Sequence, residues 1–475
     1  MTLLSDLTTL LGPTNVVTGP DLARYTSDWT THYTASPLAV ARPGSTAEVA
    51  AVVKLAARHN TPIVPSSGRT GLVGGSMTTG GLMVTVERLN KIREVRPATR
   101  IAIVEAGVIL QRLHEAAEAQ NLYFPLWFGA RGSAMIGGVL STNAGGSNVL
   151  RYGSTRALCL GLEVVLPDGR ILNLMSELHK NNSGYDLRQL FIGAEGTLGI
   201  ITAAVMKLVP RPRAYATATL AARSLPDALQ LLNRLQAASG GAVEAFEYMP
   251  ATYMQRLAEQ RPDIRLPFDR RYDTNILVEI GATAPRDAEP GPDGTIPVVA
   301  LLEQTLSDMI DEGAVLDAEI AQTEAQRLAM WKRRELAAEI TVARQPAIDT
   351  DVALPLDLVP EFYDRIHARL PAIDPGAETL SVCHLGDGNV HFHVRPPAGS
   401  GEEWLDGEGK AASAFVHDLV TAAGGTISAE HGIGQMKIGE LQRLGSPARL
   451  SAMRAIKAAL DPMGILNPGK LLPPA

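Results

Sequence analysis

The sequence predicts a mixed α+β protein of two or three domains, from its length, its composition and the order of its apolar segments. The chain has 475 residues, and domains usually contain about 100–200 residues, so a single core is not expected. Hydrophobic residues make up 45% and charged residues 20%, which is ordinary for a globular chain that buries large cores. Short apolar strands and helical stretches alternate in two regions, which meet at Val209-Pro210-Arg211-Pro212. A proline pair of this kind is typical of a domain boundary.

Before this boundary, the expected elements are short. Leu3 to Leu11 predicts a helix that Gly12-Pro13 ends. Ser45 and Thr46 provide an N-cap for an alanine-rich helix over 47–59. A third helix is expected over 109–120. Brief apolar runs bounded by Gly, Pro or Asp predict strands at 38–41, 63–65, 82–86, 101–107, 161–166 and 170–174.

After the boundary, the helices are longer. Helices are expected over 224–239 and 298–312, with a strand at 275–280 between them. Two further strands, 380–382 and 390–394, are joined through Gly386-Asp387-Gly388, so they predict a hairpin.

Charge and cysteine content exclude several classes of protein. The net charge is -7 and no basic patch occurs, which argues against a nucleic-acid partner. No run of 18 apolar residues and no basic leader are present, so we expect a cytoplasmic protein. Cys159 and Cys383 are too few for a disulfide framework and are expected to be reduced, buried thiols. A thiolate ligand at Cys383, beside His384, is the alternative.

Three glycine-rich segments indicate a large ligand that contains phosphate. Ser66 to Ser76 holds four glycines and several hydroxyl side chains, a composition typical of a loop whose N–H groups bind an anion. Neither GxxxxGK[ST] nor GxGxxG occurs in this loop, which disfavours a Walker site and a nicotinamide-type Rossmann site. The other two segments, 129–153 and 184–202, are also rich in glycine. Such backbone is costly in a packed core but suits a surface that wraps a flat ligand.

A late cluster of histidines and carboxylates predicts a metal-assisted catalytic centre. It reads Cys383-His384-Leu385-Gly386-Asp387-Gly388-Asn389-Val390-His391-Phe392-His393, followed later by Ala429-Glu430-His431-Gly432-Ile433-Gly434. Strand alternation puts His391 and His393 on one face, and His384 can meet His391 across the hairpin. Two imidazoles, one carboxylate and open positions suit a catalytic zinc or manganese ion.

Taken together, these blocks resemble the vanillyl-alcohol oxidase/p-cresol methylhydroxylase (PCMH) flavoprotein superfamily. The downstream half resembles its 2-hydroxy acid branch, which includes D-lactate, glycolate and D-2-hydroxyglutarate dehydrogenases. The match runs from about 38 to 472 and ends in Leu460-Asp461-Pro462-Met463-Gly464-Ile465-Leu466-Asn467-Pro468-Gly469-Lys470. The resemblance implies a two-subdomain PCMH-type FAD-binding domain over 1–210 and an α+β substrate-binding domain (FAD-linked oxidase C-terminal) over 211–425. A segment over 426–475 would carry EHGIG and return to the FAD domain.

The resemblance also implies which residues bind FAD. The cofactor would be noncovalent, because no histidine lies between Ser66 and Ser76. The pyrophosphate would lie on Ser66, Ser67, Gly68, Arg69, Thr70, Gly71, Gly74 and Ser76. The flavin and its ribityl chain would be lined by Pro125, Gly129, Ser133, Gly137, Gly138, Asn143 and Gly145. Glu195, Gly196, Gly199 and Ile200 would lie beside the adenosine and pyrophosphate, and Asn467 completes the cofactor set.

For catalysis, the resemblance maps His384, His391 and Glu430 onto metal ligands and His431 onto the catalytic base. Asn389 falls on a position that contacts substrate or supports a ligand. Arg334 falls on an arginine that grips the substrate carboxylate, although its neighbour Arg333 could take that role instead, leaving one of the two as a surface charge. In the implied reaction, the metal binds the substrate hydroxyl and one carboxylate oxygen, His431 takes the hydroxyl proton, and the C2 hydride passes to flavin N5.

The substrate expected from this chain is a D-2-hydroxy acid, with D-lactate favoured. Hydroxyglutarate enzymes usually carry a lysine and a threonine for the distal carboxylate, and Asp349 and Ala338 occupy those positions here. An aspartate repels a second carboxylate, so D-2-hydroxyglutarate is the alternative, unless Asp349 is a misaligned loop residue.

The expected electron acceptor is an electron-transfer flavoprotein, a cytochrome or a quinone. Contact with such an acceptor could place the protein at the periphery of the inner membrane. A homodimer is a further expectation. Two alternatives come from other classes. One is a metal-dependent hydrolase, and the other is a noncatalytic flavin-carrying subunit of a glycolate-oxidase-like complex.

Overall fold

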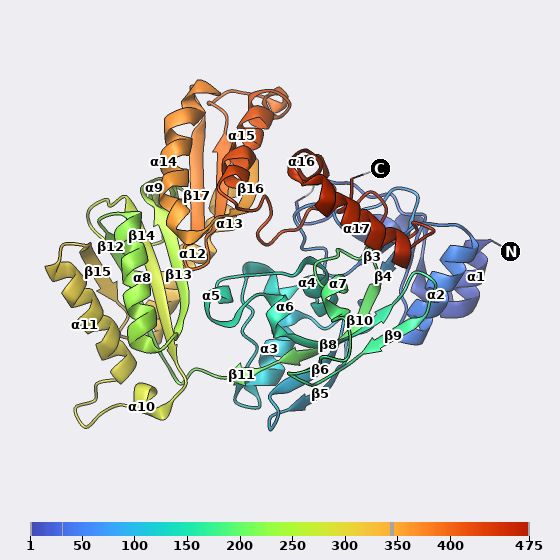
Figure 1. The fold of residues 1–475 in the computed structure, drawn as a ribbon, viewed down its shortest axis with the longest axis horizontal. Helices are drawn as coiled ribbons and strands as arrows, with labels where there is room; N and C mark the ends of the chain where they lie inside the picture. The colour runs from blue at the N-terminus through green and yellow to red at the C-terminus, as the bar shows by residue number, and fades with distance from the viewer. Residues whose placement is uncertain (1, 31, 343–345, 474–475) are drawn as a thin grey trace. The chain divides into compact units, whose positions relative to one another are not determined.

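The computed structural model describes residues 2–30, 32–342 and 346–473. The chain divides into two compact units. The first unit comprises Met1–Gly146, Gly153–Arg211 and Glu430–Ala475, and the second comprises Ser147–Tyr152 and Pro212–Ala429. Each unit has its own sheets and helices (Figure 1).

The first unit begins with a four-stranded sheet of order β1-β2-β4-β3. Its strands are β1 (Val16–Val17), β2 (Ala39–Ala41), β3 (Ile63–Ser66) and β4 (Leu82–Thr85). Helices α1 (Leu3–Leu11) and α2 (Thr46–Arg58) share one core with this sheet. The spacing of Leu3, Leu7 and Leu11 puts three leucines on one helical face, and all three are buried. As expected, the Ser45 side chain caps α2 by accepting from the Glu48 N–H.

A five-stranded antiparallel sheet follows, in the order β5-β6-β10-β8-β9. Its strands are β5 (Ile92–Arg96), β6 (Ile101–Glu105), β8 (Cys159–Val165), β9 (Ile171–Leu174) and β10 (Ile200–Lys207). A small pair joins β7 (Leu122–Tyr123) to β11 (Val209–Pro210). The helices of this part are α3 (Leu110–Glu118), α4 (Ile136–Thr142), α6 (Thr155–Leu158) and α7 (Arg188–Phe191).

The end of the chain returns to the first unit through α16 (Ile438–Leu444) and α17 (Pro447–Leu460). After α17, the Ile63 N–H donates to the Ile465 carbonyl and the Asn467 N–H donates to the Ile63 carbonyl, both at 2.7 Å. The C-terminal segment therefore runs beside β3, as the red and blue ribbons show in Figure 1.

The second unit is built on a seven-stranded antiparallel sheet of order β15-β12-β14-β13-β17-β18-β16. The strands are β12 (Ala214–Ala222), β13 (Val243–Pro250), β14 (Thr274–Ala282), β15 (Val315–Ile320), β16 (Ile348–Ala353), β17 (Glu378–His384) and β18 (Asn389–Arg395). The predicted hairpin is β17–β18. The other strands of this sheet, apart from β14, were not predicted; β12 is alanine-rich, and alanine is a weak strand former.

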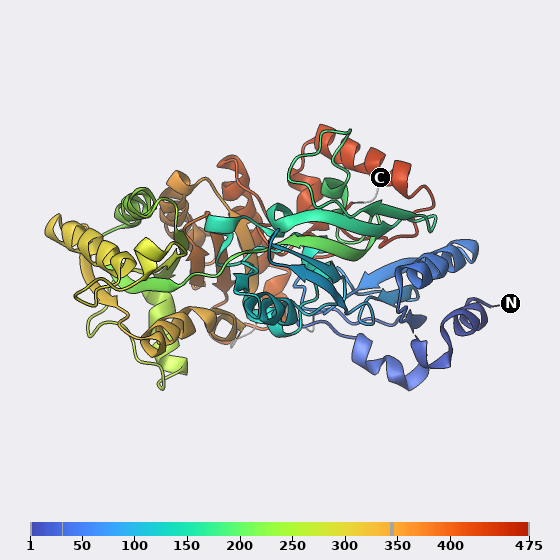
Figure 2. The same ribbon diagram turned by 90° about the horizontal axis from the view of Figure 1, so that it is seen from below.

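Helices cover both faces of this sheet (Figures 1 and 2). One apolar core holds α8 (Leu225–Ser239), α11 (Pro297–Asp311), α14 (Val359–Arg369) and α15 (Glu408–Ala422). On the other face lie α9 (Ala251–Gln260), α12 (Glu324–Glu335) and α13 (Ala337–Val342). The short helices α5 (Val149–Tyr152) and α10 (Pro285–Ala288) complete the unit.

Strand alternation separates apolar from polar side chains on β17 and β18. Val390, Phe392 and Val394 belong to the apolar core, as does Cys383, so the histidines between them point to the other face. Burial raises the pKa of the Cys383 thiol well above its ordinary value. The thiolate-ligand alternative for Cys383 is therefore wrong: its thiol lies on the face opposite to the histidines.

No described helix combines the length and the apolar character that crossing a bilayer requires.

The buried His114 on α3 predicts how the stability of the first unit depends on pH. Its ring stacks on Trp127 and its Nε2 lies 2.9 Å from the Leu126 carbonyl oxygen. Burial lowers the pKa of His114 from 6.5 to about 4. Because the unfolded chain binds this proton and the folded one does not, stability should fall as the pH drops from 6.5 toward 4. We expect wild type to lose about 1–2 kcal/mol more than His114→Gln between pH 7 and pH 5, measured by urea unfolding. Equal losses would contradict a neutral, buried His114.

Candidate active site

The loop from Ser66 to Ser76 in the first unit has the properties of an anion nest. None of the backbone N–H groups from Ser67 to Ser76 donates a hydrogen bond to another residue in the described parts of the chain. Ser66 Oγ is buried and likewise has no partner among the described residues. A Cβ at Gly71 would meet nothing within 4 Å, so the loop faces open space there. These free donors fit the pyrophosphate of a dinucleotide.

The second glycine-rich segment packs against this loop. A Cβ on Gly68 would lie 2.2 Å from the Ser133 carbonyl oxygen, and one on Gly138 would lie 3.1 Å from the Ser67 Cβ. A Cβ on Gly137 would lie 2.8 Å from the Cβ of Ala106. Larger residues at these positions would separate the two segments, so the glycines bring the predicted pyrophosphate and flavin residues side by side. Gly129, at the start of a single 3-10 turn, faces open space, and Pro125 lies in the extended stretch before it.

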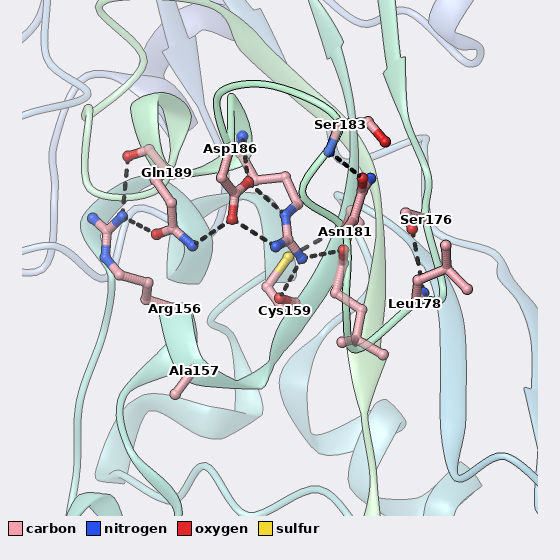
Figure 3. A network of polar contacts seen from close by, with 12 residues as sticks. Arg156, Ala157, Cys159, Ser176, Leu178, Asn181, Ser183, Asp186 and Gln189 are labelled. Carbon is pink, nitrogen blue, oxygen red and sulfur yellow. Dashed lines mark hydrogen bonds and ion pairs between the residues drawn. The ribbon is translucent and has the colours of Figure 1, made fainter.

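A polar network links the second and third glycine-rich segments through Arg156. Asn143, at φ 52° after α4, accepts from the Arg156 N–H at 2.9 Å through its side-chain oxygen. The Arg156 guanidinium donates to Gln189 (Figure 3). Arg188 pairs with Asp186 at 2.6 Å and donates to the carbonyl of Leu160 on β8. The side chain of Asn143 therefore stabilises this turn, and its predicted contact with flavin stays a prediction.

Glu195 and Asn467 connect the pyrophosphate loop, the third glycine-rich segment and the C-terminal part of the chain. Asn467 Nδ2 donates to the carbonyls of Glu195 at 2.6 Å and Gly75 at 3.0 Å, while its Oδ1 is buried without a partner among the described residues. The Glu195 carboxylate accepts from the N–H groups of Ile433 and Gly434. All of the predicted cofactor residues, including Gly196, Gly199 and Ile200, lie in the first unit.

In the second unit, the structure brings His384 and His391 together. Their rings are 5.4 Å apart between centroids and nearly perpendicular. In the β17–β18 ladder, His384 is opposite Asn389 and Val382 is opposite His391. The two histidines are therefore diagonal neighbours on one face of the hairpin, as the sequence predicted.

Glu247 on β13 is the site residue that the sequence interpretation missed. It is fully buried, and its carboxylate accepts from His384 Nδ1 and from Arg334 Nε, both at 2.8 Å. Burial alone would raise the pKa of Glu247, but His384 and Arg334 outweigh it and hold the pKa below its ordinary value. This anion directs the Nδ1–H of His384 toward itself, so the lone pair of the ring lies on Nε2. Nothing in the local sequence marks Glu247, which lies 137 residues before His384.

Asp351 on β16 lies beside His391, as Glu247 lies beside His384. Its Oδ1 is 3.7 Å from His391 Nδ1 and accepts from Asn389 Nδ2 at 2.9 Å. Asn389 also donates to the Val352 carbonyl at 3.0 Å, and its buried Oδ1 has no partner among the described residues. Asn389 therefore holds the carboxylate beside a histidine, and its part in catalysis stays a prediction.

A third histidine and carboxylate form a couple on the same face. His393 Nδ1 lies 2.5 Å from Asp349 Oδ1, and the two residues are directly opposite in the β16–β18 ladder. Asp349 is therefore a strand residue, and the alternative that it belongs to a loop is wrong. Ala338 lies on α13.

The structure separates the two adjacent arginines of α12. Arg334 Nη2 lies 3.4 Å from His384 Nε2, whereas Arg333 pairs with Glu319 at 3.0 Å on β15. Both are buried, at 8% and 4% exposure, so the expectation that one is a surface charge is wrong. Arg334 is the arginine beside the histidines.

Glu430 and His431 begin the last part of the first unit. They follow Ala429 directly in the chain, and the Ala429 N–H donates to the Asp351 carbonyl at 3.2 Å. A Cβ on Gly145 would lie 2.5 Å from Glu430 Oε1, so a larger residue there would displace the Glu430 side chain. The sequence expected Gly145 beside the flavin, and its contact in the first unit is with this carboxylate.

Comparison with known proteins shows the family of this chain. Residues 37–175 match the FAD binding domain model, and residues 211–471 match the model of the FAD linked oxidases, C-terminal domain. The chain is 36% identical to D-2-hydroxyglutarate dehydrogenase of Stutzerimonas stutzeri (strain A1501), over 99% of this chain and 98% of that protein. It is also 36% identical to the mitochondrial D-2-hydroxyglutarate dehydrogenase of Bos taurus, over 97% of this chain and 82% of that protein. This chain belongs to the FAD-dependent D-2-hydroxy acid dehydrogenases.

The membership of this dehydrogenase family confirms the resemblance and the FAD cofactor, and the hydrolase alternative is wrong. The fold is that of the PCMH-type proteins: p-cresol methylhydroxylase with substrate bound has a TM-score of 0.74 to this structure. The identity is 15%, over 98% of this chain and 96% of that one. The predicted α+β class is confirmed. The dehydrogenase is an oxidoreductase that acts on the CH–OH group of a 2-hydroxy acid.

Proposed function

We propose that this dehydrogenase oxidises D-2-hydroxyglutarate to its 2-oxo acid, with FAD and a divalent metal. The observation that carries the proposal is that Arg334 and His384 both donate hydrogen bonds to the Glu247 carboxylate. It puts a carboxylate-binding guanidinium beside a histidine with an oriented metal-binding nitrogen. The names of the two relatives described above support the substrate.

The donor set fits zinc or manganese. His384 and His391 each have Nδ1 near a buried carboxylate, so Nε2 of each ring would be the ligand atom. Glu430 would be the third ligand. It follows Ala429, whose N–H donates a hydrogen bond to the Asp351 carbonyl. A divalent metal bound there would lower the pKa of the substrate hydroxyl.

The chain's own residues would perform three tasks. Arg334, oriented by Glu247, would hold the substrate carboxylate with its planar fork. Asn389 would keep Asp351 directed at His391. His431 would accept the hydroxyl proton. The glycine-rich loops would hold FAD, whose chemistry supplies an acceptor for the C2 hydride, and the final electron acceptor would be an electron-transfer flavoprotein, a cytochrome or a quinone.

D-lactate is the second candidate, and the couple of Asp349 and His393 favours it. Neither this couple nor Ala338 offers the fixed positive charge that a distal carboxylate prefers. The couple is not a bare anion either, because His393 Nδ1 faces the Asp349 carboxylate. The repulsion expected from Asp349 is therefore weaker than the sequence suggested, and D-2-hydroxyglutarate remains the first candidate.

An anaerobic titration of the FAD-loaded protein tests this function. We expect D-2-hydroxyglutarate to bleach the flavin absorbance more efficiently than D-lactate, glycolate, D-malate or L-lactate, and a chelator to abolish the bleaching. Greater efficiency with D-lactate would transfer the assignment to D-lactate. A flavin that no hydroxy acid bleaches would favour the noncatalytic subunit.

The variant Asp349→Lys tests whether residue 349 determines the preference between D-2-hydroxyglutarate and D-lactate. A lysine there would add a cation beside His393, so the ratio of kcat/KM for D-2-hydroxyglutarate over D-lactate should rise about tenfold. The variant Asp357→Lys, which makes the same change in a turn after β16, is the control and should leave the ratio unaltered. An unchanged ratio in Asp349→Lys would show that this couple lies away from the distal end of the substrate.

A further inference from the structure

We propose that Glu195 is a positioning residue that holds the loop 431–434 and thereby sets the position of His431. The sequence suggested a place beside the adenosine for Glu195, but its carboxylate points to this loop. The catalytic part of the proposal rests on the proposed role of His431 as the base. The holding of the loop rests on contacts within the first unit alone.

The Glu195 carboxylate binds two consecutive backbone N–H groups. Oε1 accepts from the Ile433 N–H and Oε2 accepts from the Gly434 N–H, each at 2.7 Å. The residue is 7% exposed, so water competes little for these bonds. Hydrogen bonds to a charged acceptor are stronger than neutral ones. This pair holds the chain immediately after His431.

The glycines of His431-Gly432-Ile433-Gly434 are required by this approach. Gly432 has φ +86°, and a Cβ there would lie 2.8 Å from Glu195 Oε1. Gly434 has φ +50°, and a Cβ there would lie 2.1 Å from the Val73 carbonyl oxygen. Any other residue would push the loop away from Glu195 or from Val73. The two glycines therefore allow the loop to approach both Glu195 and Val73.

Glu195 itself is fixed by the backbone around it. Its N–H donates to the Ser141 carbonyl at 2.8 Å, and its carbonyl accepts from Asn467 Nδ2 at 2.6 Å. Its backbone is left-handed, at φ 49°, a conformation that surrounding contacts must stabilise in a glutamate. These contacts fix the position of the Glu195 carboxylate, and its hydrogen bonds then fix the position of the loop 431–434.

The far end of the loop is held by the pyrophosphate loop. The Gln435 N–H donates to the Val73 carbonyl at 2.9 Å, and Gln435 Nε2 donates to the Gly74 carbonyl at 2.7 Å. Residues 433–435 therefore connect Glu195 with the predicted FAD-binding loop. The segment that carries His431 is constrained relative to the residues that bind the cofactor.

Burial of this carboxylate has an energetic cost, which its hydrogen bonds to the loop offset in part. Burial raises the pKa of Glu195, while the Ile433 and Gly434 N–H groups and Lys437 oppose that rise. A neutral side chain could fill the space without this cost, but it could not accept from both N–H groups.

The variant Glu195→Gln, studied in the FAD-loaded protein, tests the proposal. Glutamine keeps the shape, but it offers one acceptor oxygen and one NH₂, so one of the two N–H groups would face a donor. We expect hydrogen exchange at Ile433 and Gly434 to become about tenfold faster. We also expect the limiting rate of flavin reduction by D-2-hydroxyglutarate to fall about tenfold, with FAD content unchanged.

The matched control is Glu244→Gln in the second unit. Glu244 is 2% exposed and accepts from Arg151 at 2.8 Å and Tyr152 at 2.6 Å, so the substitution also removes a buried charge. It should leave both readouts as in wild type. Gly432→Ala is a second test, because its Cβ would push the loop and the Glu195 carboxylate apart without removing the carboxylate, and it should change both readouts in the same direction as Glu195→Gln.

The outcomes are distinguishable. Unchanged exchange at both amides, or faster exchange with an unchanged reduction rate, would overturn the proposal while leaving the proposed function intact. Loss of FAD from Glu195→Gln without faster exchange would overturn it in favour of a cofactor-binding role. If no hydroxy acid reduces the wild-type flavin, the proposed function fails, and exchange at the two amides alone decides whether Glu195 holds the loop.

Discussion

Replacing Glu247 with glutamine is expected to lower the rate of flavin reduction by about 10- to 100-fold. The carboxylate accepts from His384 Nδ1 and Arg334 Nε at once. A glutamine has one acceptor oxygen, so its NH₂ would face one of these two donors. The histidine tautomer or the arginine position must then change. Stopped-flow absorbance at the flavin band measures the rate, and metal analysis of the purified variant measures the loss of affinity for the ion.

The same substitution should also destabilise the protein by about 3–5 kcal/mol, because it leaves buried partners without their anion. Glu279→Gln is the matched control. Glu279 is 3% exposed on the neighbouring strand β14 and binds Arg327 and Trp331 of α12. We expect it to cost comparable stability without an effect on flavin reduction. Equal losses of activity in both variants would mean that Glu247 has only a structural role.

The second large effect is expected for His431→Ala, which should slow flavin reduction by about 10²- to 10⁴-fold. Removing the imidazole removes the proposed acceptor of the hydroxyl proton, while the FAD-binding loops stay intact. The FAD content and the free energy of unfolding should therefore remain close to those of wild type. Single-turnover reduction by D-2-hydroxyglutarate under anaerobic conditions is the direct measurement, because it excludes the electron acceptor from the rate.

His59→Ala is the control for His431→Ala. His59 lies in the same unit, where its Nε2 is 2.8 Å from Asp6 Oδ2, and it has no part in the proposed chemistry. We expect its flavin to be reduced at the wild-type rate. A wild-type rate in His431→Ala itself would show that another group takes the proton.

Local patterns predicted much of this protein. The run from Leu3 to Leu11, ended by Gly12-Pro13, predicted α1 with the bounds that the structure has. Alternation on β18 predicted that His391 and His393 share one face, and the hairpin predicted that His384 meets His391. Glycine-rich loops without a Rossmann fingerprint indicated a large ligand that contains phosphate. Each of these features depends on residues close together in the chain.

The sequence by itself determined the His384–His391 hairpin and the motif around His431, and its resemblance to the flavoprotein superfamily determined the cofactor class. Only the tertiary structure decided which carboxylates orient these groups. Glu247 reaches His384 across 137 residues and Glu195 reaches Ile433 across 238. Strand periodicity tells which face a residue occupies, but it does not tell which strands become neighbours. A buried glutamate acquires its role from partners that folding brings to it, so no local pattern marks it in the chain.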